Sequence, residues 1–141
     1  MARQTIAWRA VRLLIAGSAV GELAVGIAAT VAPGALTNFL LGATVEGTGA
    51  VVARMAGIAV AALGLGWWID RSRLDLSRLR RVAGSYLVYN FGIGALFLAY
   101  ASTADRVILV SWMVAVIHLV AAGAFIVALA RLRPAAETGR A

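Results

Sequence analysis

Four polar side chains interrupt long apolar stretches of the chain and are the best candidates for chemistry: Glu22, Arg54, Asn90 and His118. A polar or charged side chain is costly in hydrocarbon, so each should be paired inside the protein or line a wet cavity. Glu22 and His118 supply a carboxyl and an imidazole, a combination that can transfer protons at neutral pH. They are therefore the candidate catalytic residues if the protein is an enzyme.

These residue types indicate a metal or cofactor site less strongly than they indicate proton transfer. One histidine, one intramembrane carboxylate and no cysteine are too few ligands for a closed zinc or iron site. Ligand count alone leaves single-histidine haem ligation open, and a bound quinone is equally open, but the sequence requires no cofactor. Phosphate-binding loops, dinucleotide glycine fingerprints, catalytic serine motifs and thiol motifs are all missing from the sequence.

The composition indicates that lipid surrounds most of the chain. Hydrophobic residues make up 62% of the 141 residues and charged residues only 13%, about half the charged share of a soluble domain. A soluble chain of this length could not bury so much apolar surface. The net charge of +7 comes from arginine alone, in short runs between apolar stretches. This is a membrane-topology pattern, so nucleic acid is not an expected partner.

Four apolar stretches approach or exceed the length of about 20 residues that is needed to cross a bilayer. They predict a single transmembrane domain over residues 1–141. The expected spans are Val11–Ala32, Ala50–Ile69, Val82–Ala101 and Val107–Ala130. The predicted fold class is therefore all-α, an integral membrane antiparallel four-helix bundle. The helix-ending Pro33 is followed by Ala35–Leu41, which predicts a short interfacial helix between spans one and two.

Arginine positions give the expected orientation of these spans. Eleven of the 13 arginines fall in the N-terminal segment, the 70–81 connection or the C-terminal tail, which share one side of the membrane. The positive-inside rule places that side, with both chain ends, in the cytoplasm. Within the 70–81 connection, Asp75 and Arg78 are spaced to pair on one helix face. The expected location is the inner membrane of a bacterium, as a multi-pass protein.

Small residues share a helix face with the polar residue in every span, which indicates that these faces point into the bundle. In span two the face carries Gly57, Ala61 and Gly64; in span one, Gly17 and Gly21 form a further small pair beside Glu22. Tyr86, on the Asn90 face, and Trp112, near the outer end of span four, complete the candidate ligand-binding or polar cluster with the four residues above.

Depths follow from a rise of about 1.5 Å per residue. Glu22 and His118 both lie near the membrane midplane and Asn90 lies close to that level, whereas Arg54 is near the outer end of its span. Two interpretations stay open. In one, Glu22, Asn90 and His118 hydrogen-bond one another as interhelical contacts worth about 1 kcal/mol each. In the other, Glu22 and His118 form an acid–base pair beside an apolar cavity.

Several short motifs resemble those of the DoxX-like group of small bacterial four-helix membrane proteins. They are Pro33 at the end of span one, Arg54-Met55-Ala56-Gly57 and Leu63-Gly64 in span two, Tyr89-Asn90 in span three and His118 in span four. The similarity would cover roughly residues 13–130. The resemblance implies a link to quinone-coupled or oxidative-stress membrane complexes. It supplies no agreed catalytic residues, and the absence of cysteine argues against a thiol redox role.

The leading expectation is a protein that binds a lipophilic ligand, such as a quinone, isoprenoid or lipid, or serves as an accessory subunit of a membrane complex. Its expected partners are the bilayer, a hydrophobic small molecule and either further copies of itself or a larger membrane complex. The alternative is a small membrane enzyme in which Glu22 and His118 perform isomerisation, cyclisation or epoxide opening on a hydrophobic substrate.

Overall fold

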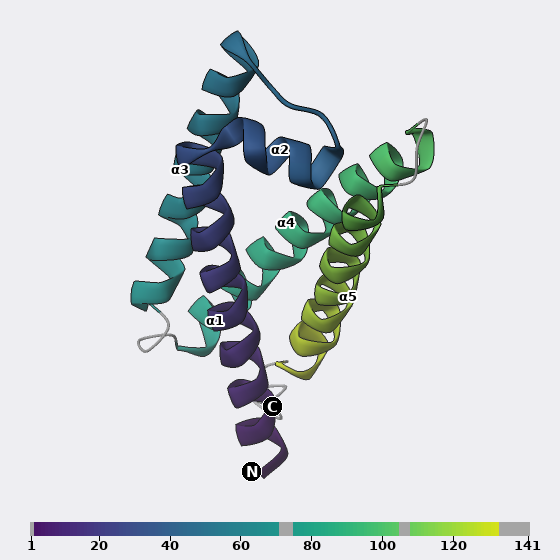
Figure 1. Ribbon diagram of the computed structural model, residues 1–141. Helices are drawn as coiled ribbons and strands as arrows, with labels where there is room; N and C mark the ends of the chain where they lie inside the picture. The colour runs from purple at the N-terminus through teal and green to yellow at the C-terminus, as the bar shows by residue number, and fades with distance from the viewer. Residues whose placement is uncertain (1, 71–74, 105–107, 133–141) are drawn as a thin grey trace.

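A computed structural model describes residues 2–70, 75–104 and 108–132 of the chain. Every regular element in this part is an α-helix, in agreement with the predicted all-α class. The helices are α1 (Ala2–Val31), α2 (Pro33–Leu41), α3 (Gly47–Asp70), α4 (Leu76–Thr103) and α5 (Leu109–Arg131), as Figure 1 shows. All but α2 are long and apolar enough to span a bilayer, so this is a membrane protein with four candidate transmembrane helices.

The start of α4 lies well before the expected Val82, at Leu76, because Asp75 caps the helix. The Asp75 carboxylate accepts the Arg78 backbone N–H at 2.7 Å and the Ser77 hydroxyl at 2.9 Å. The bond from Arg78 satisfies a free N–H group at the start of the helix, and both bonds lower the pKa of Asp75. Asp75 thus contacts the backbone of Arg78, where the spacing predicted an ion pair. The 70–81 connection also includes residues 71–74, which lie outside the described residues.

The predicted short helix after Pro33 is present as α2. Proline occupies its first turn, where the missing N–H costs no hydrogen bond. Its end is set by Gly42, whose φ of 65° is left-handed and whose N–H donates to the Asn38 carbonyl. The location of α2 at the membrane interface stays a prediction.

Helices α1 and α3 pack closely along the small-residue face predicted for the second span. At Gly57, a Cβ atom would lie 2.7 Å from the Gly26 carbonyl oxygen and 2.8 Å from the Ala29 Cβ. At Gly64, a Cβ would lie 2.7 Å from the Ala19 carbonyl oxygen. Only glycine allows the two backbones to approach this far. The stripe predicted from the sequence is therefore the α1–α3 contact.

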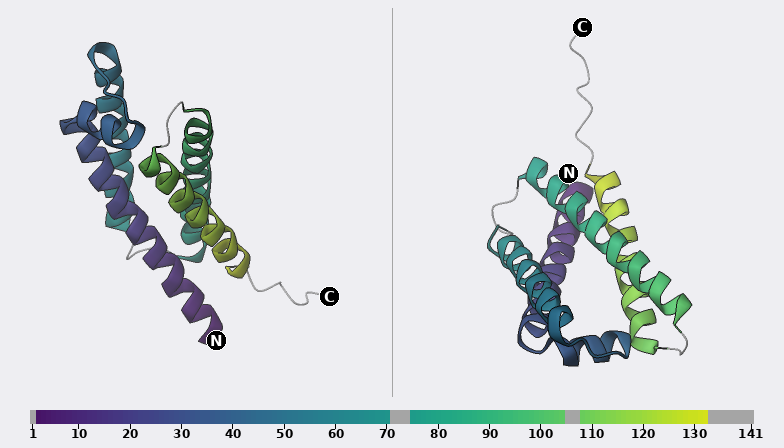
Figure 2. Two further views of the ribbon diagram at one scale, coloured as in Figure 1. Left: turned by 45° about the vertical axis from the view of Figure 1, so that its right-hand side comes forward. Right: turned by 90° about the horizontal axis from the view of Figure 1, so that it is seen from above.

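Helices α4 and α5 form a second close pair, in which Leu119 covers Gly94. The described helices are therefore arranged as two antiparallel pairs, α1 with α3 and α4 with α5 (Figures 1 and 2). The sequence predicted an antiparallel four-helix bundle; over the described residues the backbones of α3 and α4, which are neighbours in the chain, do not pack against each other. The small-residue face of α3 contacts α1 instead.

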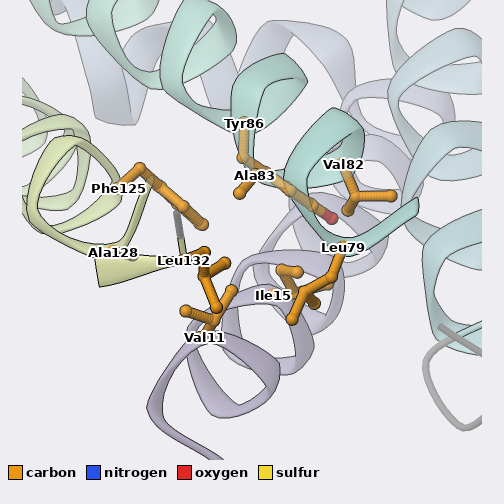
Figure 3. Close-up of a cluster of buried hydrophobic side chains, with 9 residues drawn as sticks. All are labelled: Val11, Ile15, Leu79, Val82, Ala83, Tyr86, Phe125, Ala128 and Leu132. Atoms are coloured by element: carbon orange, nitrogen blue, oxygen red, sulfur yellow. The ribbon is translucent and has the colours of Figure 1, made fainter. Parts of the chain in front are cut away.

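The two pairs meet at both ends of the molecule. At the end that carries the N-terminus, side chains of α1, α4 and α5 form the buried core drawn in Figure 3, where Tyr86 stacks on Phe125 with ring centroids 5.5 Å apart. At the opposite end α2 bridges the pairs: the Tyr100 hydroxyl donates to the Leu41 carbonyl at 2.6 Å, and the Ser111 hydroxyl donates to the Leu40 carbonyl. Between these two contacts the pairs diverge.

Candidate functional site

A cavity of about 480 Å³ lies between the two helix pairs, and all five helices contribute to its lining. Most of the lining is aliphatic or aromatic, and includes Val25, Val60, Ile93, Phe97, Val114 and Ile117. The α2 bridge reaches it through Leu40. The cavity follows from the fold: pairs that are held together at both ends and packed internally by glycine leave the space between them unfilled.

One turn of α4 positions the polar groups at this cavity. The Asn90 side-chain amide donates to the Tyr86 carbonyl of its own helix at 2.8 Å, and Asn90 is buried. His118 of α5 then contacts the Asn90 side chain, with 2.8 Å between His118 Nδ1 and Asn90 Oδ1. Asn90 thus fixes the imidazole at the cavity wall.

Glu22 of α1 is held by the same turn of α4. The Tyr86 hydroxyl donates to Glu22 Oε2 at 3.2 Å, and both residues are buried. The Tyr86 ring is anchored between Phe125 and Trp67, whose ring centroid lies 5.8 Å away. The carboxyl is therefore tied to a rigid part of the core rather than free in the cavity.

The structure brings Glu22, Asn90 and His118 to one cavity. The hydrogen bonds differ from the interpretation in which these three residues bond one another. Glu22 pairs with Tyr86, and His118 pairs with Asn90. No direct hydrogen bond joins Glu22 to His118 in the described part of the chain. Tyr86 and Asn90 are one helical turn apart on α4, so each engages a different neighbouring helix.

Two members of the predicted cluster lie elsewhere. Arg54 is exposed on α3, and its Nε donates to the Thr30 carbonyl at 3.2 Å, in the last turn of α1. A cation at a helix C-terminus satisfies free carbonyl groups there, which explains this position. Trp112 is partly buried near the start of α5 and does not line the cavity.

Other residues at the cavity were not in the predicted cluster. Tyr89 and Ser18 line it, and the Tyr89 ring meets the His118 ring edge-on with centroids 5.9 Å apart. Gly17 and Gly21 also line it, where the spacing predicted a packing contact. A Cβ at either glycine would have no neighbouring atom within 4 Å. The α3 helix occupies the adjacent face of α1, so this glycine pair opens onto the cavity.

Several residues of α1 and α5 that line the cavity are also exposed. Gly21 on α1 lines the cavity and is exposed. Val25, one turn further along, is 46% exposed and Ile117 on α5 is 60% exposed, although both also line the cavity. Both α1 and α5 are candidate transmembrane helices, so an exposed side of this kind suits entry of a hydrophobic molecule from lipid.

The arrangement suits recognition of an organic molecule better than a metal ion. Among the described residues, no three His, Cys, Asp or Glu side chains gather closely enough to hold a metal. The cavity instead offers a carboxyl, an imidazole and hydroxyl groups set in an apolar wall. Comparisons with protein-family models, with curated proteins and with solved structures return no match for this chain.

Proposed function

We propose that this protein binds a lipophilic small molecule, of the quinone, isoprenoid or lipid class, in the cavity between its helix pairs. The observation that carries the proposal is the cavity itself: about 480 Å³, mainly apolar, with polar groups of Glu22, Asn90 and His118 on its wall. Ligand sites typically have about 300–1,000 Å³ and a few placed polar groups in an apolar lining. The protein performs this role alone, as a homo-oligomer or as an accessory subunit of a larger membrane complex.

The proposed setting is the bacterial inner membrane, with both chain ends in the cytoplasm. Among the described residues, Arg9, Arg12, Arg78, Arg81 and Arg131 all belong to the helix ends at the side of the N-terminus. Arg54 belongs to the opposite end. This asymmetry supports the positive-inside orientation, and in that orientation α2 belongs to the proposed outer interface.

The proposal is tested with a matched pair of glycine variants. Gly21→Leu places a bulky side chain at the cavity, whereas Gly123→Leu places the same side chain in open space on α5, away from the cavity lining. Neither position has atoms within 4 Å of a Cβ, so both variants should fold. Native mass spectrometry from mild detergent should show a bound lipophile in the wild type and Gly123→Leu, and its loss in Gly21→Leu. Equal occupancy in all three proteins would contradict binding in this cavity.

A second candidate function is a small membrane enzyme, and one observation favours it: a carboxyl and an imidazole line the same apolar cavity. In that case Glu22 and His118 would exchange protons with a bound hydrophobic substrate during isomerisation, cyclisation or epoxide opening. Glu22→Gln distinguishes the two functions. An enzyme would keep its ligand but stop converting it, because an amide cannot exchange the proton; a binding protein would keep its ligand unchanged.

The DoxX-like resemblance belongs to the same proposal. The motifs that carry it occupy two regions of the structure: Gly57 and Gly64 lie in the close α1–α3 contact, and Tyr89-Asn90 and His118 line the cavity. Motifs placed at the packing contact and at the cavity support a shared architecture and a shared type of ligand. A role in a quinone-linked membrane complex is the form of the proposal that this resemblance favours.

A further inference from the structure

We propose that the ligand carries a hydroxyl group, as an isoprenoid alcohol or a hydroquinone does, and that it donates this hydroxyl to Nε2 of His118. This inference rests on the proposed function and narrows its ligand class. It is derived from the hydrogen bonds that orient Asn90 and His118.

The orientation of the Asn90 amide follows from its contact with α4. The Tyr86 carbonyl oxygen, 2.8 Å away, can only accept a hydrogen bond, so the Asn90 group that faces it is the NH₂. The other end of the amide, Oδ1, consequently faces His118. Since Asn90 is buried by helix packing, the amide cannot exchange its two ends without losing both contacts.

The protonation of the imidazole follows in turn. Asn90 Oδ1 can only accept, so His118 Nδ1, 2.8 Å away, must carry the hydrogen. A charged ring in this apolar surrounding would need a paired carboxylate, and the Glu22 carboxyl is instead bonded to Tyr86. In the neutral ring with hydrogen on Nδ1, Nε2 is an acceptor.

Nε2 of His118 has no hydrogen-bond partner among the residues that the structure describes, while His118 lines the cavity. A bound group that donates would satisfy it. A quinone carbonyl, an ester or an ether would not, because each only accepts. The hydroxyls of Ser18 and Tyr89 line the same cavity and can donate to a ligand oxygen. An alcohol or phenol, which both donates and accepts, fits this set.

The first test determines which nitrogen of the His118 imidazole carries the hydrogen. His118 is the chain's sole histidine, so ¹⁵N-histidine NMR of the full protein in detergent reports it without assignment. We expect a protonated Nδ1 and an unprotonated Nε2 at neutral pH. Asn90→Leu removes the acceptor and should shift the ring toward the Nε2–H form. A wild-type ring protonated at Nε2, or at both nitrogens, would overturn the inference.

The second test compares farnesol with its methyl ether, which keeps the chain and the oxygen but loses the donor. Competition measured by native mass spectrometry should show the alcohol binding about tenfold more tightly, because an unsatisfied buried acceptor and a lost hydrogen bond together cost about that factor. His118→Phe keeps a ring of similar shape and should bring the ratio close to one.

The outcomes separate this inference from the proposed function. The hydroxyl preference would be refuted if alcohol and ether bound equally to the wild type and both failed to bind to Gly21→Leu. The cavity would then remain a site for lipophilic molecules. Binding of neither molecule above the Gly21→Leu level would refute both. If His118→Phe does not fold, the NMR measurement and the wild-type ratio decide the matter.

Discussion

The close α1–α3 contact predicts that alanine will be tolerated at some glycines and harmful at others. At Gly57 a Cβ would lie 2.7 Å from the Gly26 carbonyl oxygen, a backbone atom that cannot turn away. To reach the 3.4 Å at which ordinary van der Waals contact begins, the two helices would have to separate by about 0.7 Å locally. Gly57→Ala should therefore behave as an overpacked core substitution.

The expected loss can be set against a matched control. Overpacking typically costs about 1–3 kcal/mol, and this exceeds the gain of at most about 1 kcal/mol that alanine brings over glycine in a helix. At Gly21 no atom lies within 4 Å of a Cβ, so Gly21→Ala should keep only the gain. We expect Gly57→Ala to be destabilised and Gly21→Ala to be as stable as the wild type or slightly more stable.

The assay is thermal unfolding in detergent micelles, monitored by far-ultraviolet circular dichroism. Gly64→Ala should resemble Gly57→Ala, since its Cβ would lie 2.7 Å from the Ala19 carbonyl oxygen. Leu63→Ala, at a side chain that is 53% exposed, should be mild. Equal effects at Gly21 and Gly57 would refute the claim that one glycine face packs and the other borders a cavity.

Two further predictions concern individual contacts, and a third concerns the orientation of the spans. Asp75→Ala should fray the start of α4 and lower the unfolding temperature, whereas Asp75→Asn, which can still cap the helix, should not. The Arg78 N–H and the Ser77 hydroxyl lower the pKa of Asp75. The stabilisation by the carboxylate is therefore present at neutral pH and is lost on acidification through that lowered pKa. Tyr86→Phe leaves the Glu22 carboxyl without its donor and should cost about 1–3 kcal/mol of unfolding free energy, measured by the same unfolding assay, and an unchanged stability would mean that the bond is not formed. A reporter fused after Ala141 should give a cytoplasmic signal and one inserted near Gly47 a periplasmic signal; the reverse would overturn the orientation.

Much of the fold could be predicted from the sequence because lipid imposes a simple rule on composition. Apolar stretches of sufficient length had to be helices, and Gly57, Ala61 and Gly64 recur at a spacing that marks a packing face. The partner of that face could not be predicted, since spacing on one helix does not say which neighbour approaches. The Gly17 and Gly21 pair has the same spacing, yet it borders open space.

The candidate site was predicted in part. Depth along each helix placed Glu22 and His118 at one level, and both residues line the cavity. Depth does not give the direction around the helix axis, so the division of hydrogen bonds between Tyr86 and Asn90 could not be foreseen. The position of Arg54 could not be foreseen for the same reason. Its charge indicated a place in the polar cluster inside the membrane, whereas its side chain reaches the Thr30 carbonyl at the end of α1.

Photoaffinity labelling can show directly whether a ligand occupies the cavity between the helix pairs. The probe is a long-chain isoprenoid alcohol that carries a diazirine, and the labelled residues are mapped by mass spectrometry. We expect labels on cavity-lining residues such as Ile93, Phe97 and Ile117, and the loss of these labels when unlabelled farnesol is in excess. Labelling of exposed outer side chains such as Val88 and Val120 should persist under the same competition, because those contacts are with bulk lipid. Labels confined to such outer positions, with none at the cavity and no effect of competitor, would contradict ligand binding between the helix pairs.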